Sequence, residues 1–156
     1  MKEYEITKNF DHANIVHSIE LFDNTLKEEV HQVMEYVQGL EVLDSIAQQP
    51  HGCYTESDAK GIFKQILQGI QYLHAQGVAH RDIKPQNLLV TQTQKVVIID
   101  FNISSKKPEG QSDFRMMTKT GTVAFSAPEI FTQKVYDEKV DIWSAATVLY
   151  IMLSGN

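Results

Sequence analysis

The sequence predicts an α+β protein, in which a small part that contains strands precedes a mainly helical part. Two runs rich in β-forming residues, 13–22 and 28–37, lie near the start of the chain. Apolar residues at helical spacing follow from Thr55. Residues 140–153 are apolar almost throughout and are long enough for a buried helix. With 156 residues, the chain can form one domain with a hydrophobic core.

Charge and composition narrow the classes of function. The net charge is −6, from 20 acidic and 14 basic residues, which argues against non-specific binding of nucleic acid or of an anionic membrane surface. The hydrophobic fraction of 42% and the charged fraction of 22% are those of an ordinary globular protein. These values leave room for an anionic small ligand, because the charge of a local site can differ from the mean.

The single cysteine, Cys53, excludes a disulfide within the chain and favours a reducing, intracellular setting, which predicts a cytoplasmic protein. The opening residues "MKEYEITKNF" contain no apolar core of a signal peptide. No apolar run is long enough to predict a membrane span.

The first elements are a helix and two strands. A helix is expected over residues 1–11, where Ile6 and Phe10 are four positions apart. Strands are expected over 13–22 and 28–37, with Gly39 ending the second. Two strands alone are marginally stable, so this part needs further structure beside it.

A long helix is expected from Thr55, whose hydroxyl is a candidate N-cap with Asp58 three residues later. Gly77 is expected to stop this helix. The predicted buried face consists of apolar residues at helical spacing: Ile62, Phe63, Ile66, Leu67, Ile70 and Leu73.

The rest of the chain alternates short strands, a loop and a helix. Residues 88–90 and 96–99 are expected to form a hairpin joined by the polar segment "TQTQK". Residues 106–117 predict a mobile loop. Residues 140–153 predict a helix that is buried on all sides.

Four polar residues border this hairpin. Asp82, Lys84 and Asn87 enter its first strand, and Asp100 leaves its second, so the pairing of the strands should bring all four together. The oxygens of Asn87 and Asp100 suit Mg²⁺, which favours one or two carboxylates together with the phosphates of a substrate. Asp82 could accept a proton from a hydroxyl, and Lys84 could neutralise a phosphate. Together these groups predict phosphoryl transfer.

Four motifs then occur in a fixed order. "HRDIKPQN" at 80–87 resembles the catalytic loop of eukaryotic protein kinases, and "DFN" at 100–102 stands where that family has DFG. "APE" at 127–129 and "DIW" at 141–143 follow. The resemblance covers nearly the whole chain.

The resemblance implies a protein-kinase-like fold. Residues 1–36 correspond to a remnant of the small lobe, with part of helix C and two strands, and residues 37–156 to part of the large lobe. "LSG" near the end of the chain resembles the calcium/calmodulin-dependent group.

The resemblance also implies catalytic roles. Asp82 matches the base that orients a substrate hydroxyl, and Lys84 the lysine near the transferred phosphate in serine/threonine kinases. Asn87 and Asp100 match the metal ligands. The implied cofactors are ATP and Mg²⁺, and the implied partner is a protein with a Ser or Thr hydroxyl.

A nucleotide site follows from the same resemblance. "VMEYV" at 33–37 resembles the hinge that binds adenine, with Met34 as gatekeeper and backbone groups of Glu35 and Val37 as contacts. Glu41 is expected to reach the ribose, and Leu89 to pack beneath the adenine ring.

Four further residues match regulatory positions in the family. Glu3 matches the glutamate of helix C, and Arg81 the arginine that pairs with a phosphate on the activation loop. Thr118 matches a site that an upstream kinase phosphorylates, and its phosphate could dock on Arg81. Thr122 matches the threonine that bonds the base and shapes the substrate pocket.

The sequence departs from the family in several places. No glycine-rich loop or small-lobe lysine precedes Glu3, and the arginine that would pair with Glu129 is absent. Asn102 replaces the glycine of DFG, a change that a left-handed backbone tolerates. Thr7 and Ser18 stand where the family stacks aliphatic side chains between the lobes, which predicts a poorly held active state.

Two hypotheses therefore remain open. The chain is either part of a protein serine/threonine kinase or a non-catalytic, kinase-like binding or regulatory module. Intact Asp82, Lys84, Asn87 and Asp100 favour the kinase, and the absent loop and lysine favour the module.

Overall fold

The computed structural model describes residues 2–24, 28–111 and 113–155 and confirms the predicted α+β class. The elements in chain order are α1 (Lys2–Thr7), β1 (Ser18–Asn24), β2 (Glu29–Met34), β3 (Gly39–Glu41), α2 (Val42–Ala47), α3 (Glu56–Ala75), β4 (Val78–Ala79), the 3₁₀ turn η1 (Pro85–Asn87), β5 (Leu88–Thr91), β6 (Val96–Ile98), β7 (Ser105–Lys106), the 3₁₀ turn η2 (Val123–Phe125), α4 (Glu129–Thr132) and α5 (Val140–Ser154).

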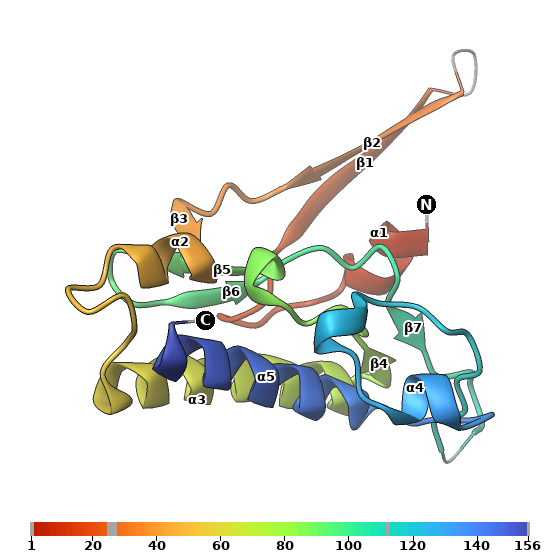
Figure 1. The fold of residues 1–156 in the computed structure, drawn as a ribbon. Coiled ribbons are helices and arrows are strands. Elements are labelled where there is room, and N and C mark those ends of the chain that lie inside the picture. Colours follow the sequence, from red (N-terminus) through yellow and green to blue (C-terminus); the bar gives the residue numbers. More distant parts are fainter. Residues whose placement is uncertain (1, 25–27, 112, 156) are drawn as a thin grey trace.

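The two predicted N-terminal strands pair as an antiparallel ribbon that projects away from the rest of the molecule (Figure 1). The first strand begins at Ser18, later than expected. Before it, Ile15 forms a parallel bridge with Ile98, and Val16 N–H donates to the Ile98 carbonyl at 3.0 Å. Residues 14–16 are therefore bound to the body of the protein, and the first predicted strand is divided between two places.

A sheet of order β3–β5–β6 lies below the ribbon, and it confirms the predicted hairpin (Figure 1). The expectation that Gly39 ends a strand is wrong, because Gly39 begins β3 and pairs with Thr91. A Cβ atom at Gly39 would lie 2.9 Å from the carbonyl oxygen of Val90. Gly39 is needed for this close approach of two backbones.

The long helix α3 forms as predicted. The Thr55 hydroxyl accepts a hydrogen bond from Asp58 N–H at 3.2 Å, as expected of an N-cap. The helix ends at Ala75, and Gly77 follows with φ +68°, a conformation that glycine adopts without strain. Its buried residues pack against α5 and against β6 of the sheet (Figure 1).

The prediction that helix 140–153 is buried on all sides is wrong. One face of α5 packs against α3, but Trp143 is 51% exposed and Tyr150 is 68% exposed. The sequence could not show this, because the solvent-facing positions of the helix are as apolar as its buried ones. Among the described residues, no helix is both long and apolar enough to cross a bilayer.

Segment 106–117, expected to be a mobile loop, is anchored at both ends. Lys107 N–H donates to the Gly77 carbonyl at 2.7 Å, next to the pairing of β4 with β7. Phe114 and Met116 are buried, and Met116 exchanges two backbone hydrogen bonds with Tyr136 at 3.0 Å. The sequence does not predict these contacts, because Phe114 and Met116 stand among polar residues.

Asn14 connects the N-terminal part to the body. Its side-chain amide donates to the Val96 carbonyl at 2.7 Å and to Gln65 Oε1 at 3.2 Å, and its own carbonyl accepts from Ile98 N–H at 2.9 Å. The side chain is buried, so the bonds are shielded from water.

Asn14→Ala should therefore lower the free energy of unfolding by about 1–3 kcal/mol, because the buried Val96 carbonyl would lose a donor. Asn24→Ala is a matched control at the end of β1, and should change stability by less than about 0.5 kcal/mol. Urea denaturation measures both, and equal effects of the two substitutions would contradict the assignment.

Candidate active site

Three predicted residues, Lys84, Asn87 and Thr122, surround the carboxylate of Asp82 in the loop between β4 and β5. Asp82 Oδ2 accepts hydrogen bonds from Lys84 Nζ at 2.6 Å and from Asn87 Nδ2 at 3.0 Å. Asp82 Oδ1 accepts from the Thr122 hydroxyl at 2.9 Å and from Thr122 N–H at 3.2 Å. Lys84 Nζ also donates to the Thr122 hydroxyl at 3.0 Å. Through Thr122, these hydrogen bonds join the loop to a segment forty residues further along the chain.

These contacts decide the charge of Asp82. Burial by itself raises the pKa of its carboxyl group, but hydrogen bonds from Lys84, Thr122 and Asn87 outweigh burial, and the pKa lies below its ordinary value. Asp82 is therefore an ionised acceptor at neutral pH. Its two oxygens are held by donors on both sides, which suits a group that must point at one hydroxyl.

The two predicted metal ligands lie at the outer ends of the hairpin: Asn87 ends η1 directly before β5, and Asp100 follows β6 by two residues. Asn87 Nδ2 donates to both the carbonyl and the carboxylate of Asp82, and no group in the described part of the chain donates to Asn87 Oδ1. Asp100 Oδ1 accepts from Asn102 N–H at 3.2 Å, and Asp100 has φ +63°. Ile99 N–H donates to the Asn87 carbonyl at 3.0 Å, which connects the two ligand positions through the backbone.

A buried carboxylate, Asp141, holds the start of the loop. Its Oδ2 accepts from His80 N–H at 2.9 Å, and its Oδ1 accepts from Arg81 N–H at 2.7 Å. Arg81 has φ +68°, a conformation that costs energy in a residue with a side chain. His74 Nε2 lies 2.9 Å from the same Asp141 Oδ2. The role of His74 could not be predicted, because the sequence around a histidine in a helix does not show which residue that histidine will contact.

His80 links the loop to the hairpin in a neutral form. Its Nδ1 accepts from Asp82 N–H at 3.2 Å, so Nε2 carries the proton that is donated to the Ile99 carbonyl at 3.1 Å. Burial lowers the pKa of His80 below its ordinary value. Its ring also packs edge-on against Phe101, with centroids 4.8 Å apart.

A cleft of about 370 Å³ lies between the ribbon and the sheet. The expected nucleotide-site residues Met34, Glu35, Val37, Leu89 and Asp100 all line it. The full lining is Glu3, Val16, Met34, Glu35, Tyr36, Val37, Leu89, Ile99, Asp100 and Asn102. Glu41, which was also expected there, is on β3 and outside this lining. In the described part of the chain, no backbone hydrogen bond uses the Glu35 carbonyl or the peptide groups of Val37.

Glu3 enters this cleft from α1 and touches the backbone beside Asp100. Its Oε1 accepts a hydrogen bond from Phe101 N–H at 3.0 Å. The carboxylate that matches the helix C glutamate therefore accepts a hydrogen bond from the segment that carries Asp100.

The expected phosphate-binding arginine is engaged by groups of the chain. Arg81 Nε donates to the Ile103 carbonyl at 2.8 Å, and Nη1 donates to the Tyr136 hydroxyl at 3.3 Å. The Tyr136 hydroxyl in turn donates to the Thr118 carbonyl at 2.5 Å. Arg81 and the predicted modification site Thr118 therefore lie on either side of one hydroxyl.

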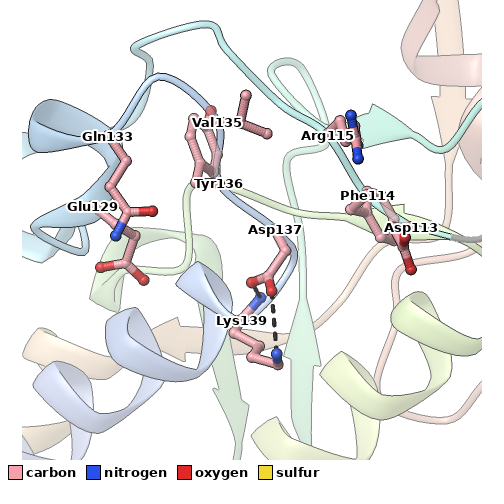
Figure 2. Close-up of a pocket in the computed structure, with 9 residues that line it drawn as sticks. All are labelled: Asp113, Phe114, Arg115, Glu129, Gln133, Val135, Tyr136, Asp137 and Lys139. Atoms are coloured by element: carbon pink, nitrogen blue, oxygen red, sulfur yellow. Dashed lines mark hydrogen bonds and ion pairs between the residues drawn. The ribbon is translucent and has the colours of Figure 1, made fainter.

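A larger cavity of about 640 Å³ lies away from Asp82, between α4 and residues 113–115 (Figure 2). Glu129 lines it, and no described side chain pairs with its carboxylate. Glu129 is only half-buried, so contact with the open cavity reduces the cost of an unpaired carboxylate. The cavity contains one ion pair, between Lys139 and Asp137 at 3.2 Å (Figure 2).

Comparison with known proteins agrees with this geometry. A family model described as "Protein kinase domain" matches residues 1–156. Serine/threonine-protein kinase H1 of Homo sapiens is 38% identical over 156 aligned residues, which cover 98% of this chain and 36% of that protein. Calcium/calmodulin-dependent protein kinase type 1 of Macrobrachium nipponense is also 38% identical, over 98% of this chain and 43% of that protein. Myosin light chain kinase A of Dictyostelium discoideum is 40% identical, over 98% of this chain and 50% of that protein. The chain thus spans 36 to 50% of the length of these relatives.

The neutral state of His80 has a consequence for stability. Because burial lowers its pKa, acidification below about pH 6.5 protonates this histidine first in the unfolded chain. The free energy of unfolding should therefore fall by up to about 1.4 kcal/mol per pH unit until the folded-state pKa is reached.

Urea denaturation between about pH 7 and pH 5.5 measures this slope. His80→Phe should reduce the slope, whereas His51→Gln, at an exposed histidine, should leave it unchanged. An unaltered slope in His80→Phe would show that His80 does not contribute to it.

Proposed function

The chain belongs to the protein kinase domain family, and on that premise we propose that it is the part of a protein serine/threonine kinase that carries the catalytic loop. The reaction is transfer of the γ-phosphate of ATP to a Ser or Thr hydroxyl of a protein substrate. In this proposal, residues 1–36 belong to the small lobe and residues 37–156 to the large lobe. The cluster of Asp82, Lys84 and Thr122 is the observation that carries the proposal.

Asp82 is the group that meets the substrate hydroxyl. It is ionised, and its position is determined by donors on both oxygens, so it would accept a hydrogen bond from the hydroxyl and orient its oxygen for attack. Lys84, a cation 2.6 Å from Asp82, would stabilise negative charge on the phosphate during transfer. Thr122 forms hydrogen bonds with Asp82 and Lys84. It would hold its own segment, which would shape the substrate pocket, next to these two residues.

The donors beside the cleft fit a magnesium ion. Asn87 offers a free amide oxygen and Asp100 a carboxylate, both hard oxygen ligands of the kind that Mg²⁺ binds together with phosphates. When bound, Mg²⁺ would neutralise charge on the phosphate oxygens of ATP. The unused carbonyl of Glu35 and peptide groups of Val37 suit the edge of an adenine ring, with Leu89 lining the same cleft.

A ribose contact by Glu41 would require its exposed side chain to reach into the cleft from β3. Regulation by phosphorylation of Thr118 is also part of the proposal. Thr118 is exposed, and a phosphate there would bring up to two negative charges toward Arg81, whose nearest partner on that side is Tyr136. An upstream kinase would be the partner that supplies this phosphate.

Asp82→Asn in the complete protein should lower kcat for peptide phosphorylation by about 10²–10⁴-fold, because the amide cannot accept the hydroxyl proton. KM for ATP should change little, since Asp82 does not line the cleft of Glu35, Val37 and Leu89. Asp44→Asn, at an exposed position of α2, is the matched control and should retain full activity. Incorporation of labelled phosphate measures both, and wild-type turnover by Asp82→Asn would contradict the assignment.

Binding of Mg²⁺ and ATP separates the kinase from a non-catalytic module. At a ligand concentration of about 100 Kd, the stability of the complete protein should rise by about 2.7 kcal/mol. Asp100→Ala should remove the part of this rise that depends on Mg²⁺, because it deletes a carboxylate ligand. Thermal denaturation with and without each ligand measures the rise, and a protein that melts cooperatively with no shift would favour the binding module.

A further inference from the structure

Thr7 and Ser18 form a buried pair of hydroxyls at positions where the protein kinase family stacks aliphatic side chains. Thr7 is 1% exposed and Ser18 is 3% exposed, and their oxygens lie 2.6 Å apart. Gln32 Nε2, from β2, donates to the Ser18 hydroxyl at 2.8 Å. Their polarity predicts a poorly held active state, but in the structure Thr7 and Ser18 form a hydrogen-bonded contact.

The direction of these hydrogen bonds follows from the chemistry of the groups. The Thr7 hydroxyl donates to the Glu3 carbonyl at 3.0 Å, so its single proton is used within α1. The proton between the two hydroxyls must then belong to Ser18, which receives a hydrogen bond from the Gln32 amide. Gln32 Nε2 also donates to the Thr7 hydroxyl at 3.4 Å. Donation therefore runs from Gln32 to both hydroxyls, from Ser18 to Thr7, and from Thr7 to Glu3. We call these four residues the hydroxyl relay.

The hydroxyl relay ends at the residue that touches the Asp100 segment. Glu3 accepts the last hydrogen bond of the relay with its carbonyl, and its carboxylate accepts from Phe101 N–H at 3.0 Å. Phe101 follows Asp100 directly and is buried. Hydrogen bonds, joined through the covalent bonds of Glu3 between its carbonyl and its carboxylate, thus connect β2 of the ribbon to the backbone beside a predicted metal ligand.

We propose that Gln32, Ser18 and Thr7 are positioning residues for Asp100, and act by fixing α1 so that Glu3 holds the Phe101 backbone. The inference rests on the proposed kinase function, because Asp100 matters there as a ligand of Mg²⁺. A polar contact fixes the position of α1 more narrowly than an apolar one would. Stacked aliphatic side chains can slide past one another, whereas a hydrogen bond between two hydroxyls requires a particular distance and angle.

The relay also explains how α1, a helix of six residues, is held in place. A helix so short has little stability of its own, so its position depends on tertiary contacts. Ile6 and Phe10 supply apolar contact with the core. The relay adds the directional contact, at the side of α1 that faces β1 (Figure 1).

The test uses substitutions that remove a hydroxyl with little change of shape. Thr7→Val takes away the acceptor of the Ser18 proton, and Ser18→Ala takes away the hydroxyl that donates to Thr7, so each breaks the bond between the two hydroxyls; the double variant removes both ends of that bond. Thr147→Val is the matched control, because Thr147 in α5 makes the same bond to a carbonyl four residues earlier, to Trp143 at 3.1 Å, but belongs to no relay.

Two measurements on the complete protein read the effect. Each single substitution should lower kcat at saturating ATP and Mg²⁺ by up to about tenfold, the size of the loss of one buried hydrogen bond. Each should also shift the Phe101 amide resonance in protein labelled with ¹⁵N-phenylalanine. The double variant should lose less than the product of the two single losses, because both substitutions break the same bond between the two hydroxyls. Thr147→Val should change neither measurement.

An unchanged kcat and an unchanged Phe101 resonance in both single variants would overturn the proposal, even if the melting temperature falls. Should a single variant fail to fold, Gln32→Met replaces it, since Gln32 is half-exposed and its loss removes only the first donor. That variant should shift the same resonance, and the absence of a shift would also overturn the proposal. If the wild-type protein transfers no phosphate, the proposed function fails, and the amide resonance still decides whether the relay positions Phe101.

Discussion

The carboxylate of Asp141 is the constraint on which the candidate site depends. It is buried and accepts the backbone N–H groups of His80 and Arg81 together with a contact from His74. Arg81 has a positive φ, a strained conformation that persists only where surrounding bonds enforce it. Because Asp141 comes from α5 and His74 from α3, the packing of these two helices determines the backbone from which Asp82 projects. The chemistry at the cleft thus depends on helix packing some distance away.

Charge is distributed along this loop in a way that suits its proposed task. His80 is kept neutral by burial and by two hydrogen bonds, one of them from the backbone of Asp82. Asp82 itself is kept ionised by Lys84, Thr122 and Asn87, in spite of its partial burial. His80 therefore adds no charge to the loop, and Asp82 adds a negative one. Lys84, which balances the charge of Asp82, is also the group proposed to meet a phosphate.

Several elements could be predicted from the sequence because their signals are local. The N-cap of Thr55, the period of α3 and the hairpin of β5 and β6 depend on neighbouring residues, and all three are present. The pairing of Gly39 with Thr91 and the anchoring of Phe114 depend on partners far along the chain, and both were missed. The exposed face of α5 was missed for a related reason, because a helix that is apolar all round does not reveal which face is covered.

The sequence by itself determined which chemical groups are present and in what order, because Asp82, Lys84, Asn87 and Asp100 follow one another with a spacing that a hairpin brings together. Only the tertiary structure decided how these groups are held. Thr122 reaches Asp82 from forty residues away, His74 supports Asp141 from a different helix, and Ser18 meets Thr7 across the boundary of helix and ribbon. A hydrogen bond depends on distance and angle in space, and neither quantity is written in the order of residues along a chain.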